Sequence, residues 1–492
     1  MKSFDVLVIG GGPAAITLAK NLGKEMNMAL IRPEDHSMIY CAMPYAIEGL
    51  LETDKTLKSD KIVTDAGAEL IRETVIGVNF EEKRVSCAGG QEFGWERLVI
   101  ATGAEPILPP IPGHDLDGVT VFKSQKDMER IAAMVERGVR DAVVVGAGAI
   151  GVELAQALAA KDINTHLVDM VDAMLPNLAD ADMTAAAADE LESAGIRLHL
   201  GRKVAGLAAA GASVAGAAGE AAGATPAAEA DAEAAARDLK SGAVAASPAA
   251  DPGNSSVSAV ELEGGEKLPA QLVVFAVGMK PNVELFRDSG LEMLRNGIVV
   301  DGAMRTNIEN VYAVGDCVSY YSGITGERAG GKLATNAVPM ARVLADTLRG
   351  RPREYVGFFN GSATKAGELF VGGTGLKEAE ARARYDAVVS YAEFTTTFPI
   401  MPTAKKVKLK LIADRQSGRI LGGQVVSGEP VTDKVDQMTM AIQFGITARQ
   451  LLGFSYSSQP WQSFYPAHNL LVKAAEGLVA KMNAGQRVAA RG

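Results

Sequence analysis

Cys41 is the residue of this chain whose position best suits redox chemistry. It lies within residues 40–45, Tyr-Cys-Ala-Met-Pro-Tyr, shortly after a glycine-rich segment at residues 10–15 that is typical of a nucleotide-binding turn. A thiol held beside a redox cofactor can receive electrons and pass them to another sulfur atom. The alternative is that Cys41 packs as a small hydrophobic residue, as most free cysteines do. The nucleotide-binding patterns of the chain favour the redox interpretation.

The other two cysteines, Cys87 and Cys317, show no pattern that indicates chemistry. With three cysteines in all, the chain has neither a disulfide framework nor a C-x-x-C pair. We interpret both as packing residues, and a reducing, cytoplasmic location fits this cysteine usage best.

The first nucleotide site is predicted at the N-terminus. Residues 4–9 form an apolar run typical of a buried parallel strand, and residues 13–22 follow as a helix. Gly10 permits the tight turn, Gly12 lets the backbone approach a pyrophosphate, and Ala15 is the small residue where helix packs on strand. The helix would point its N-terminus at the phosphates.

The next strand departs from this pattern. Residues 28–31 should be followed by an acid for the ribose hydroxyls, and Arg32 stands there instead. Either Glu34 or Asp35 substitutes for the acid, or the ribose is held in another way. We include Arg32 among the cofactor-binding candidates.

The second nucleotide site is predicted at residues 142–155. The next strand, residues 165–168, ends in Asp169, about 20 positions after the middle glycine, as expected of a ribose-binding carboxylate. Its charge would repel a 2′-phosphate, so we expect NADH, with NADPH as the alternative. A plainer interpretation is that Asp169 caps the next turn. The glycines of this turn are Gly146, Gly148 and Gly151.

Two nucleotide sites indicate two dinucleotides. Two nicotinamides could not usefully exchange a hydride, whereas a flavin can take a hydride from NADH and pass electrons to a thiol. We therefore expect FAD in the first site and NADH in the second.

Four further segments strengthen this assignment. Residues 98–104, 273–282, 310–316 and 332–348 follow in the order found in the pyridine nucleotide–disulfide oxidoreductases, and the chain resembles that family over nearly its whole length. The resemblance implies an α/β fold with two Rossmann-like dinucleotide-binding domains, as in glutathione reductase, and a C-terminal α+β dimerisation domain. It also implies that Glu153 lies near nicotinamide and flavin and that Asp316 binds the ribitol. The other cofactor contacts that it implies are Pro13, Ala101, Thr102, Gly103, Ile150, Gly278, Gly315, Ala334 and Asn336.

The single cysteine at position 41 selects a branch of the family. Dithiol members carry C-x-x-x-x-C here, so the chain resembles the single-cysteine members: coenzyme A disulfide reductases, persulfide reductases, NADH oxidases and NADH peroxidases. Tyr40 stands where coenzyme A disulfide reductases often have Asn.

This resemblance implies an enzyme that passes electrons from NADH through FAD to Cys41 and on to a disulfide or persulfide, such as coenzyme A disulfide. One alternative is an NADH oxidase or peroxidase that reduces dioxygen or peroxide. Another, from a different class, is an NADH-responsive flavin redox partner protein.

The C-terminal region has its own pattern. Residues 388–394, 406–413 and 420–427 read as strands and 432–444 as an amphipathic helix; the alternation at 406–411 predicts a sheet with one solvated face. The resemblance implies a homodimer in which the end of this region reaches the partner's active site. Tyr456 matches a substrate-side tyrosine, and Tyr465 and His468 are catalytic candidates for which interface packing is an equal alternative.

The predicted division of the chain follows from these patterns. Residues 210–256 are rich in Ala, Gly, Ser, Pro and Glu, so they cannot build a core and we interpret them as a mobile insertion within the NAD-binding domain. The predicted units are an FAD-binding domain at 1–112 and 283–350, an NAD-binding domain at 113–282, a dimerisation domain at 351–480 and a tail at 481–492.

Charge and hydropathy exclude some partners. The net charge of −10 argues against nucleic acid, and no apolar run reaches the length of a membrane span. The apolar start of the chain runs into three glycines and lacks a cleavage site, so we do not interpret it as a signal peptide.

Overall fold

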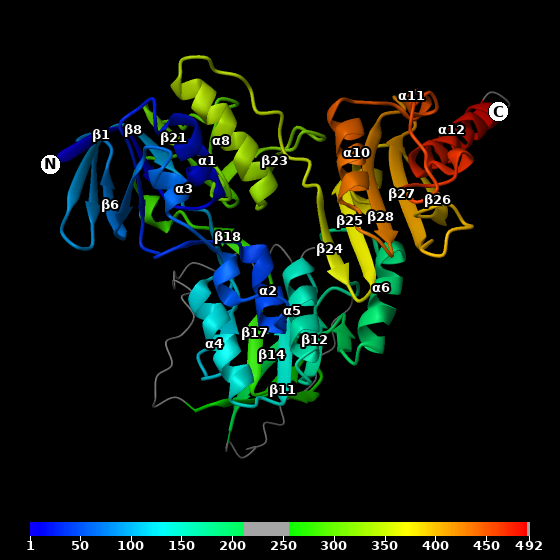
Figure 1. Cartoon of the computed structure of the whole chain (residues 1–492), viewed down its shortest axis with the longest axis horizontal. Helices are drawn as coiled ribbons and strands as arrows, with labels where there is room; N and C mark the ends of the chain where they lie inside the picture. The colour runs from blue at the N-terminus through cyan, green and yellow to red at the C-terminus, as the bar shows by residue number, and fades with distance from the viewer. Residues whose placement is uncertain (211–254, 490–492) are drawn as a thin grey trace, which may run out of the picture.

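The computed structural model describes residues 1–210 and 255–489, with side chains to residue 484. Three sheets with their helices form three lobes around a central region (Figure 1). The low-complexity segment predicted at 210–256 lies almost entirely outside the described residues. No helix among the described residues combines the length and the apolar character needed to cross a bilayer.

The first sheet contains the first glycine-rich turn. Parallel pairing joins β5, β2, β1 and β8, β21 also pairs with β8, and β7 and β6 continue the sheet in antiparallel pairing. Its core is shared with α1 and α8, which pack on each other. The strands are β1 (Lys2–Ile9), β2 (Met28–Arg32), β5 (Glu69–Arg72), β6 (Val75–Asn79), β7 (Arg84–Cys87), β8 (Glu92–Ile100) and β21 (Val311–Ala313), with helices α1 (Pro13–Leu22), α3 (Lys61–Thr64) and α8 (Ala334–Leu348).

The second sheet is wholly parallel, in the order β10-β17-β11-β12-β13. Helices pack on one face, and the antiparallel strands β14, β15 and β16 pack on the other. The elements are β10 (Val119–Val121), β11 (Asp141–Val145), β12 (Asn164–Asp169), β13 (Arg197–Leu200), β14 (Val204–Ala209), β15 (Val257–Leu262), β16 (Lys267–Pro269) and β17 (Leu272–Phe275), with α4 (Gln125–Glu136), α5 (Ala149–Ala159) and α6 (Ala181–Ser193).

The chain passes between these two sheets twice, at neighbouring places. It leaves the first sheet through β9 (Ala104–Pro106) and returns through β18 (Met279–Pro281), and the two strands pair antiparallel. After the return, β19 (Met293–Leu294), β20 (Gly297–Val299), β22 (Val318–Tyr321) and β23 (Arg328–Gly330) form a small sheet beside the first one. The two connections between the sheets thus lie side by side and are hydrogen-bonded to each other.

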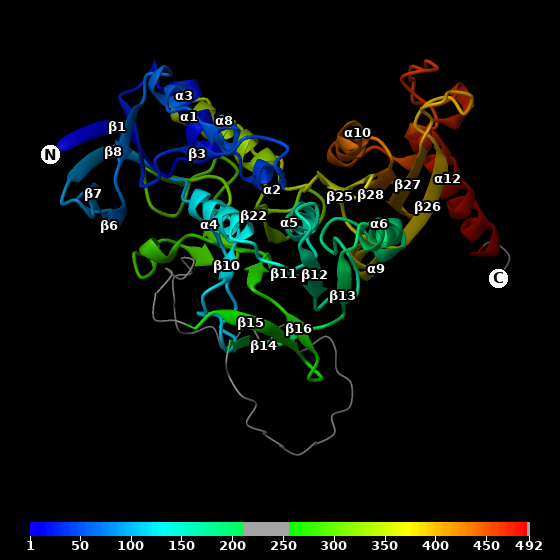
Figure 2. The same cartoon turned by 60° about the horizontal axis from the view of Figure 1, so that its bottom comes forward.

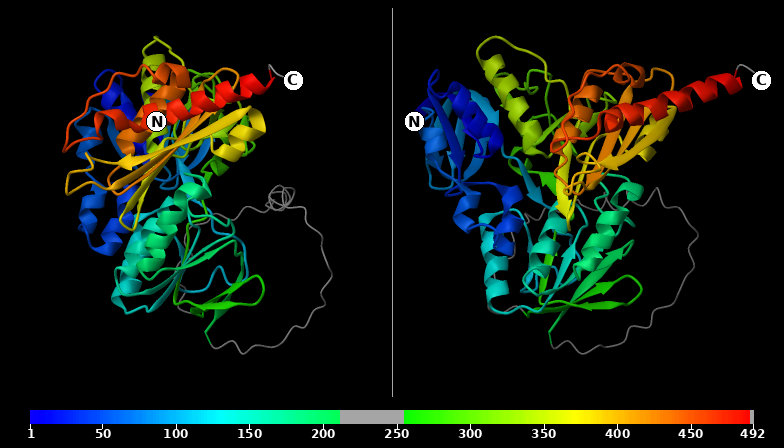
Figure 3. Two further views of the ribbon diagram at one scale, coloured as in Figure 1. Left: turned by 90° about the vertical axis from the view of Figure 1, so that its right-hand side faces the viewer. Right: turned by 45° about the vertical axis from the view of Figure 1, so that its right-hand side comes forward.

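The third sheet has the order β24-β25-β28-β27-β26 and antiparallel pairing throughout. Helix α12 lies across one face of it (Figure 3), together with α10. The predicted strands and helix are confirmed. The elements are β24 (Ser362–Ala366), β25 (Leu369–Gly375), β26 (Ala387–Thr395), β27 (Lys406–Asp414), β28 (Ile420–Ser427), α9 (Glu378–Arg384), α10 (Thr432–Gln443), α11 (Ala448–Leu451) and α12 (Leu470–Ala489).

The prediction of one solvated face for this sheet is wrong. Helices α6 and α9 contact the face opposite α12, and Lys410, expected to be exposed, is 1% exposed. Its ammonium group forms ion pairs with Asp180, Asp182 and Glu378 at 2.8–2.9 Å. The alternating pattern was read correctly as a strand, but acids from α6 and α9 make burial of the lysine tolerable.

Candidate functional site

The first glycine-rich turn is shaped to receive a phosphate group. Gly10 has φ +125°, and a Cβ added there would lie 2.1 Å from the Ala101 carbonyl oxygen, so only glycine fits. A Cβ added at Gly12 would meet no atom within 4 Å. Helix α1 begins at Pro13 with no side-chain cap, which leaves its first N–H groups open to an anion. The predicted Ala15 is fully buried under the turn.

The second turn repeats this arrangement in the second sheet. Gly146 has φ +113°, and a Cβ there would lie 2.5 Å from the Ala276 carbonyl oxygen. Gly148 faces open space, and a Cβ on Gly151 would lie 1.8 Å from the Gly146 carbonyl oxygen. Helix α5 also starts without a side-chain cap. Both turns therefore fit the pyrophosphate of a dinucleotide.

Asp169 lies at the end of β12, as predicted, and fixes the second turn. One carboxylate oxygen accepts from the Ala147 N–H at 2.6 Å, and the other accepts from the Val171 N–H at 2.8 Å. Asp169 therefore caps the turn, as the plainer interpretation expected. Each oxygen keeps a lone pair that a ribose hydroxyl could use.

Exposed apolar side chains surround the second turn. Ile150, in the first turn of α5, is 37% exposed, and Val277, just after β17, is 39% exposed. Met170 and Val171 follow Asp169 and are 70% and 44% exposed. Ligands of such sheets bind at the carboxyl ends of the strands, where these residues lie. Of these four, only Ile150 was predicted; the signal for the others is their position directly after a buried strand.

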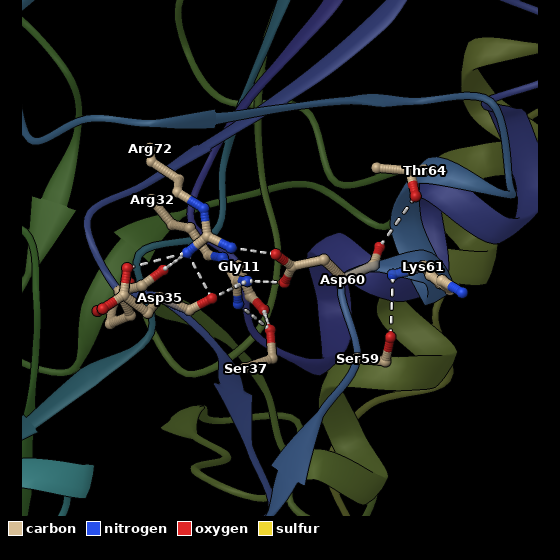
Figure 4. A network of polar contacts seen from close by, with 10 residues as sticks. Gly11, Arg32, Asp35, Ser37, Ser59, Asp60, Lys61, Thr64 and Arg72 are labelled. Carbon is tan, nitrogen blue, oxygen red and sulfur yellow. Dashed lines mark hydrogen bonds and ion pairs between the residues drawn. The ribbon is translucent and has the colours of Figure 1, made fainter.

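Arg32, which stands where an acid was expected, is buried beside the first turn (Figure 4). A Cβ on Gly11 would lie 2.3 Å from the Arg32 Cδ atom, so the side chain runs directly over the turn. Its guanidinium donates to Ser37 Oγ at 2.5 Å and forms an ion pair with Asp60, and Ser37 in turn donates to the Gly11 carbonyl oxygen at 2.6 Å. The Nε atom of Arg32 is buried and has no partner among the described residues.

Asp60 is the carboxylate that sequence analysis missed at this place. It bridges Arg32 and Arg72, which ends the neighbouring strand β5. Asp35, one of the two predicted substitutes, pairs with Arg72 at 3.1 Å and is 86% exposed. Glu34, the other, is exposed. Asp60 comes from a separate helix start, and no local pattern points to it.

The remaining predicted cofactor residues lie at the crossings between the two sheets or, further along the chain, after β21 and in α8. Thr102 donates to the Asn282 carbonyl oxygen at 2.5 Å, and the Asn282 N–H donates to the Gly103 carbonyl oxygen at 3.0 Å. Gly278 and Gly315 have φ +114° and +86°. Ala334 is the first residue of α8, whose N-terminus has no side-chain cap, and the Asn336 amide donates to the Asn360 side chain at 3.0 Å. Asp316 is half-buried; burial raises its pKa, and Lys123 and Lys332 lower it.

Cys41 is exposed within a segment that packs on the second lobe. It lies in the short 3-10 helix η1 (Tyr40–Ala42), which continues into α2 (Met43–Glu48). Met38, Met43 and Ile47 are buried in the core of α4 and α5 rather than under the first sheet. Figures 1 and 2 show α2 beside those two helices. The thiol is therefore held at the junction of the two nucleotide-binding sheets.

Glu153 joins this segment to two other parts of the chain. Its Oε1 atom accepts from the Tyr45 hydroxyl at 3.3 Å and from the Thr364 hydroxyl, on β24, at 2.7 Å. Burial raises the pKa of Glu153, although both hydrogen bonds oppose the shift. Burial, followed by the charges of Glu153 and Cys41, raises the pKa of Tyr45 to about 12. Tyr45 thus links Glu153, by a hydrogen bond, to the Cys41 thiol, whose charge acts on the same tyrosine.

Cys87 and Cys317 are buried, as predicted for packing residues. Burial raises the pKa of both thiols, that of Cys317 to about 11. Cys317 donates weakly to the carbonyl oxygens of Val314 and Ile100, at 3.4 and 3.6 Å. Neither thiol is available for exchange in this structure, because the thiolate is the reactive form.

Tyr456, Tyr465 and His468 lie close to one another but not to Cys41. The Tyr456 hydroxyl donates to the Pro466 carbonyl oxygen at 2.7 Å, and the rings of Tyr465 and His468 are 5.5 Å apart. His468 also stacks on Phe394 at 4.4 Å. A pocket of about 330 Å³ beside them is lined by Tyr456. Within one chain, the segment between α11 and α12 lies well away from α2 (Figure 1).

Comparison with known proteins gives a consistent result. The model of the family described as pyridine nucleotide-disulphide oxidoreductase matches residues 4–231 and 222–341, and that of its dimerisation domain matches residues 363–463. An NADH oxidase of Methanocaldococcus jannaschii is 30% identical over 97% of this chain and 99% of its own length. A CoA-dependent NAD(P)H sulfur oxidoreductase of Pyrococcus furiosus is 28% identical over 97% of this chain and all of its own length. The solved NAD-dependent persulfide reductase of A. fulgidus has a TM-score of 0.84 and 26% identity, covering 97% of this chain and 83% of that one.

Proposed function

This chain belongs to the pyridine nucleotide-disulphide oxidoreductase family and is an FAD-dependent NAD(P)H oxidoreductase; from that premise we propose that it passes electrons from NADH to Cys41 and then to a small disulfide or persulfide. The observation that carries the proposal is the place of Cys41. It is the exposed cysteine of the three, and its segment is built into the second lobe beside Glu153.

The residues of the two turns would hold the cofactors. Gly10, Gly12 and α1 would receive the FAD pyrophosphate, and Gly148, α5 and Asp169 would receive NADH. Bound FAD would supply the step that a protein side chain cannot, accepting a hydride from NADH and releasing electrons to sulfur. Asp60, held by Arg32, is our candidate for the missing ribose carboxylate.

Cys41 carries the sulfur chemistry in this proposal. Its thiolate attacks the substrate disulfide RSSR, a bond forms between Cys41 Sγ and one substrate sulfur, and the second substrate sulfur leaves as a thiolate. Two electrons then reduce the mixed disulfide, releasing the second thiol and restoring the Cys41 thiolate. The balance is NADH + H⁺ + RSSR giving NAD⁺ + 2 RSH. Glu153, whose pKa is raised by burial, would supply the proton that the departing thiolate needs, and Tyr45 would hold Glu153 in place through its hydrogen bond.

The names of the relatives support the proposed substrate class. The Pyrococcus furiosus relative is named as CoA-dependent and as acting on sulfur, which supports coenzyme A disulfide or a persulfide as the acceptor.

Two copies of the chain would complete the site. The segment that carries Tyr456, Trp461 and Tyr465 is 39–58% exposed at these residues, so a second copy would cover it and place it near Cys41.

A screen of acceptors tests this function. Purified protein with FAD should oxidise NADH rapidly with coenzyme A disulfide and with a persulfide, releasing two thiols per NADH from the disulfide. Reduction of dioxygen is the second candidate, favoured by the name of the Methanocaldococcus jannaschii relative. If NADH oxidation depends on dioxygen and is unchanged by disulfide or persulfide, the sulfur substrate is wrong.

A further inference from the structure

Lys123 lies where three distant segments meet, between the Cys41 segment and the second lobe. It follows β10 and precedes α4, and its backbone is fixed because its N–H donates to Asp127 Oδ2 at 3.0 Å. The ammonium nitrogen lies 4.2 Å from the centre of the Tyr40 ring and 3.9 Å from the Met279 sulfur. The residue after Tyr40 is Cys41, and Met279 begins the strand by which the chain returns to the first lobe.

The charge of Lys123 is not matched by a close carboxylate. Burial lowers the pKa of both Lys123 and Lys332, and the charge of Asp316 opposes this shift in both. Neither lysine forms an ion pair with Asp316 or with any other acid in the described part of the chain. Two partly buried cations thus share one carboxylate, and a buried cation without a partner is costly unless another anion arrives.

The location indicates what that anion is. The ammonium group of Lys123 lies over the ring of Tyr40, the residue before Cys41, and the acid whose charge acts on it is Asp316, our candidate contact of the FAD ribitol. We propose that Lys123 is the cation that stabilises the negative charge gained by bound FAD when it accepts a hydride from NADH. A hydride brings two electrons and one proton, so its uptake adds one negative charge while NADH leaves as NAD⁺.

The proposal rests on the proposed function for the position of the flavin beside Cys41. A fixed ammonium group in a site of low dielectric favours a charge that appears near it, and needs no reorganisation to do so. Lys123 therefore raises the equilibrium constant for reduction of the cofactor. The plain alternative is that Lys123 only anchors the Cys41 segment through its contact with the Tyr40 ring.

Two substitutions at Lys123 and one at Tyr40 separate these roles. Lys123→Met keeps the length of the side chain and removes the charge, whereas Lys123→Arg keeps the charge. Tyr40→Leu removes the ring and leaves the ammonium group. Lys126→Met is the matched control, because Lys126 is an exposed lysine three positions further along the chain. The reduction potential of bound FAD is measured in each protein against a reference dye, without oxygen and without any sulfur acceptor.

We expect Lys123→Met to lower the equilibrium constant for FAD reduction at least tenfold, about 30 mV for a two-electron couple. Lys123→Arg, Tyr40→Leu and Lys126→Met should each stay within threefold of the wild type. A change below threefold in Lys123→Met overturns the proposal, as does an equal change in Tyr40→Leu. If Lys123→Met does not retain FAD, Lys123→Gln is measured by the same criterion, and loss of FAD from both variants shows an anchoring role instead. Because no acceptor is present, the outcome is independent of whether Cys41 reduces disulfides, and it can be repeated in Cys41→Ser.

Discussion

Replacement of Asp169 by Asn should narrow the preference for NADH over NADPH. The carboxylate holds the second turn through two backbone N–H groups, at 2.6 and 2.8 Å, and keeps one lone pair on each oxygen for a ribose hydroxyl. Asparagine offers one oxygen and carries no charge, so it loses a charged hydrogen bond to NADH and no longer repels a 2′-phosphate. One charged hydrogen bond corresponds to about 1–3 kcal/mol, a change of about 5- to 150-fold in the ratio of the two affinities.

Rapid-mixing experiments give these affinities directly. The rate at which the absorbance of bound FAD bleaches is followed against the concentration of each nucleotide, and the half-saturation values are compared. Asp172→Asn is the control, because Asp172 is exposed three positions away and loses the same charge. A wild-type protein that prefers NADPH would refute the reasoning, and so would an equal change in both variants.

Two further predictions concern stability and cofactor retention. Lys410→Met leaves three carboxylates in one buried site, so the third lobe should lose about 3–5 kcal/mol of stability at neutral pH in urea unfolding, with Lys406→Met, at an exposed lysine of the same strand, as control. Hydrogen bonds from the lysine lower the pKa of Asp182 and Glu378. Stability from such acids is present above their unfolded pKa values and is lost as pH falls. The difference in stability between wild type and variant should therefore shrink toward pH 4, and a difference that grows on acidification contradicts this. Gly10→Ala would place a Cβ 2.1 Å from a backbone oxygen at a φ of +125° and should abolish FAD binding, whereas Gly90→Ala, at φ +81° in open space, should retain FAD with normal absorbance.

Sequence analysis predicted the parts of the fold that depend on neighbouring residues. The helix at Pro13–Leu22 has the predicted bounds because Gly12, Pro13 and the apolar spacing are all local signals. Likewise, strand β12 ends at Asp169, as expected from the apolar run before it. Local patterns of this kind set where elements begin and end.

Local sequence patterns did not predict the contacts between segments that are distant in the chain. Arg32 ends β2 and Asp60 precedes α3, and the fold brings the two side chains together. Neither stretch of sequence contains a pattern that indicates this ion pair. The predicted domain boundaries placed α2 in the first lobe, yet Met43 is buried in the core of the second. The apolar side chains of a helix do not specify which surface will cover them. Lys410 was expected to be exposed to solvent. Its burial depends on acids from α6 and α9, which are distant in sequence and do not show in the strand pattern.

Titration of a Cys41→Ser variant without oxygen tests the central claim most directly. NADH should bleach the FAD absorbance of both wild type and variant, because hydride transfer to the cofactor does not use the thiol. Addition of coenzyme A disulfide should restore the absorbance of the wild type and release free thiol, and in the variant this step should slow by orders of magnitude, since serine cannot form the mixed disulfide. Cys87→Ala, which removes a buried thiol, should behave as the wild type. If Cys41→Ser is reoxidised by the disulfide at the wild-type rate, Cys41 does not carry the electrons.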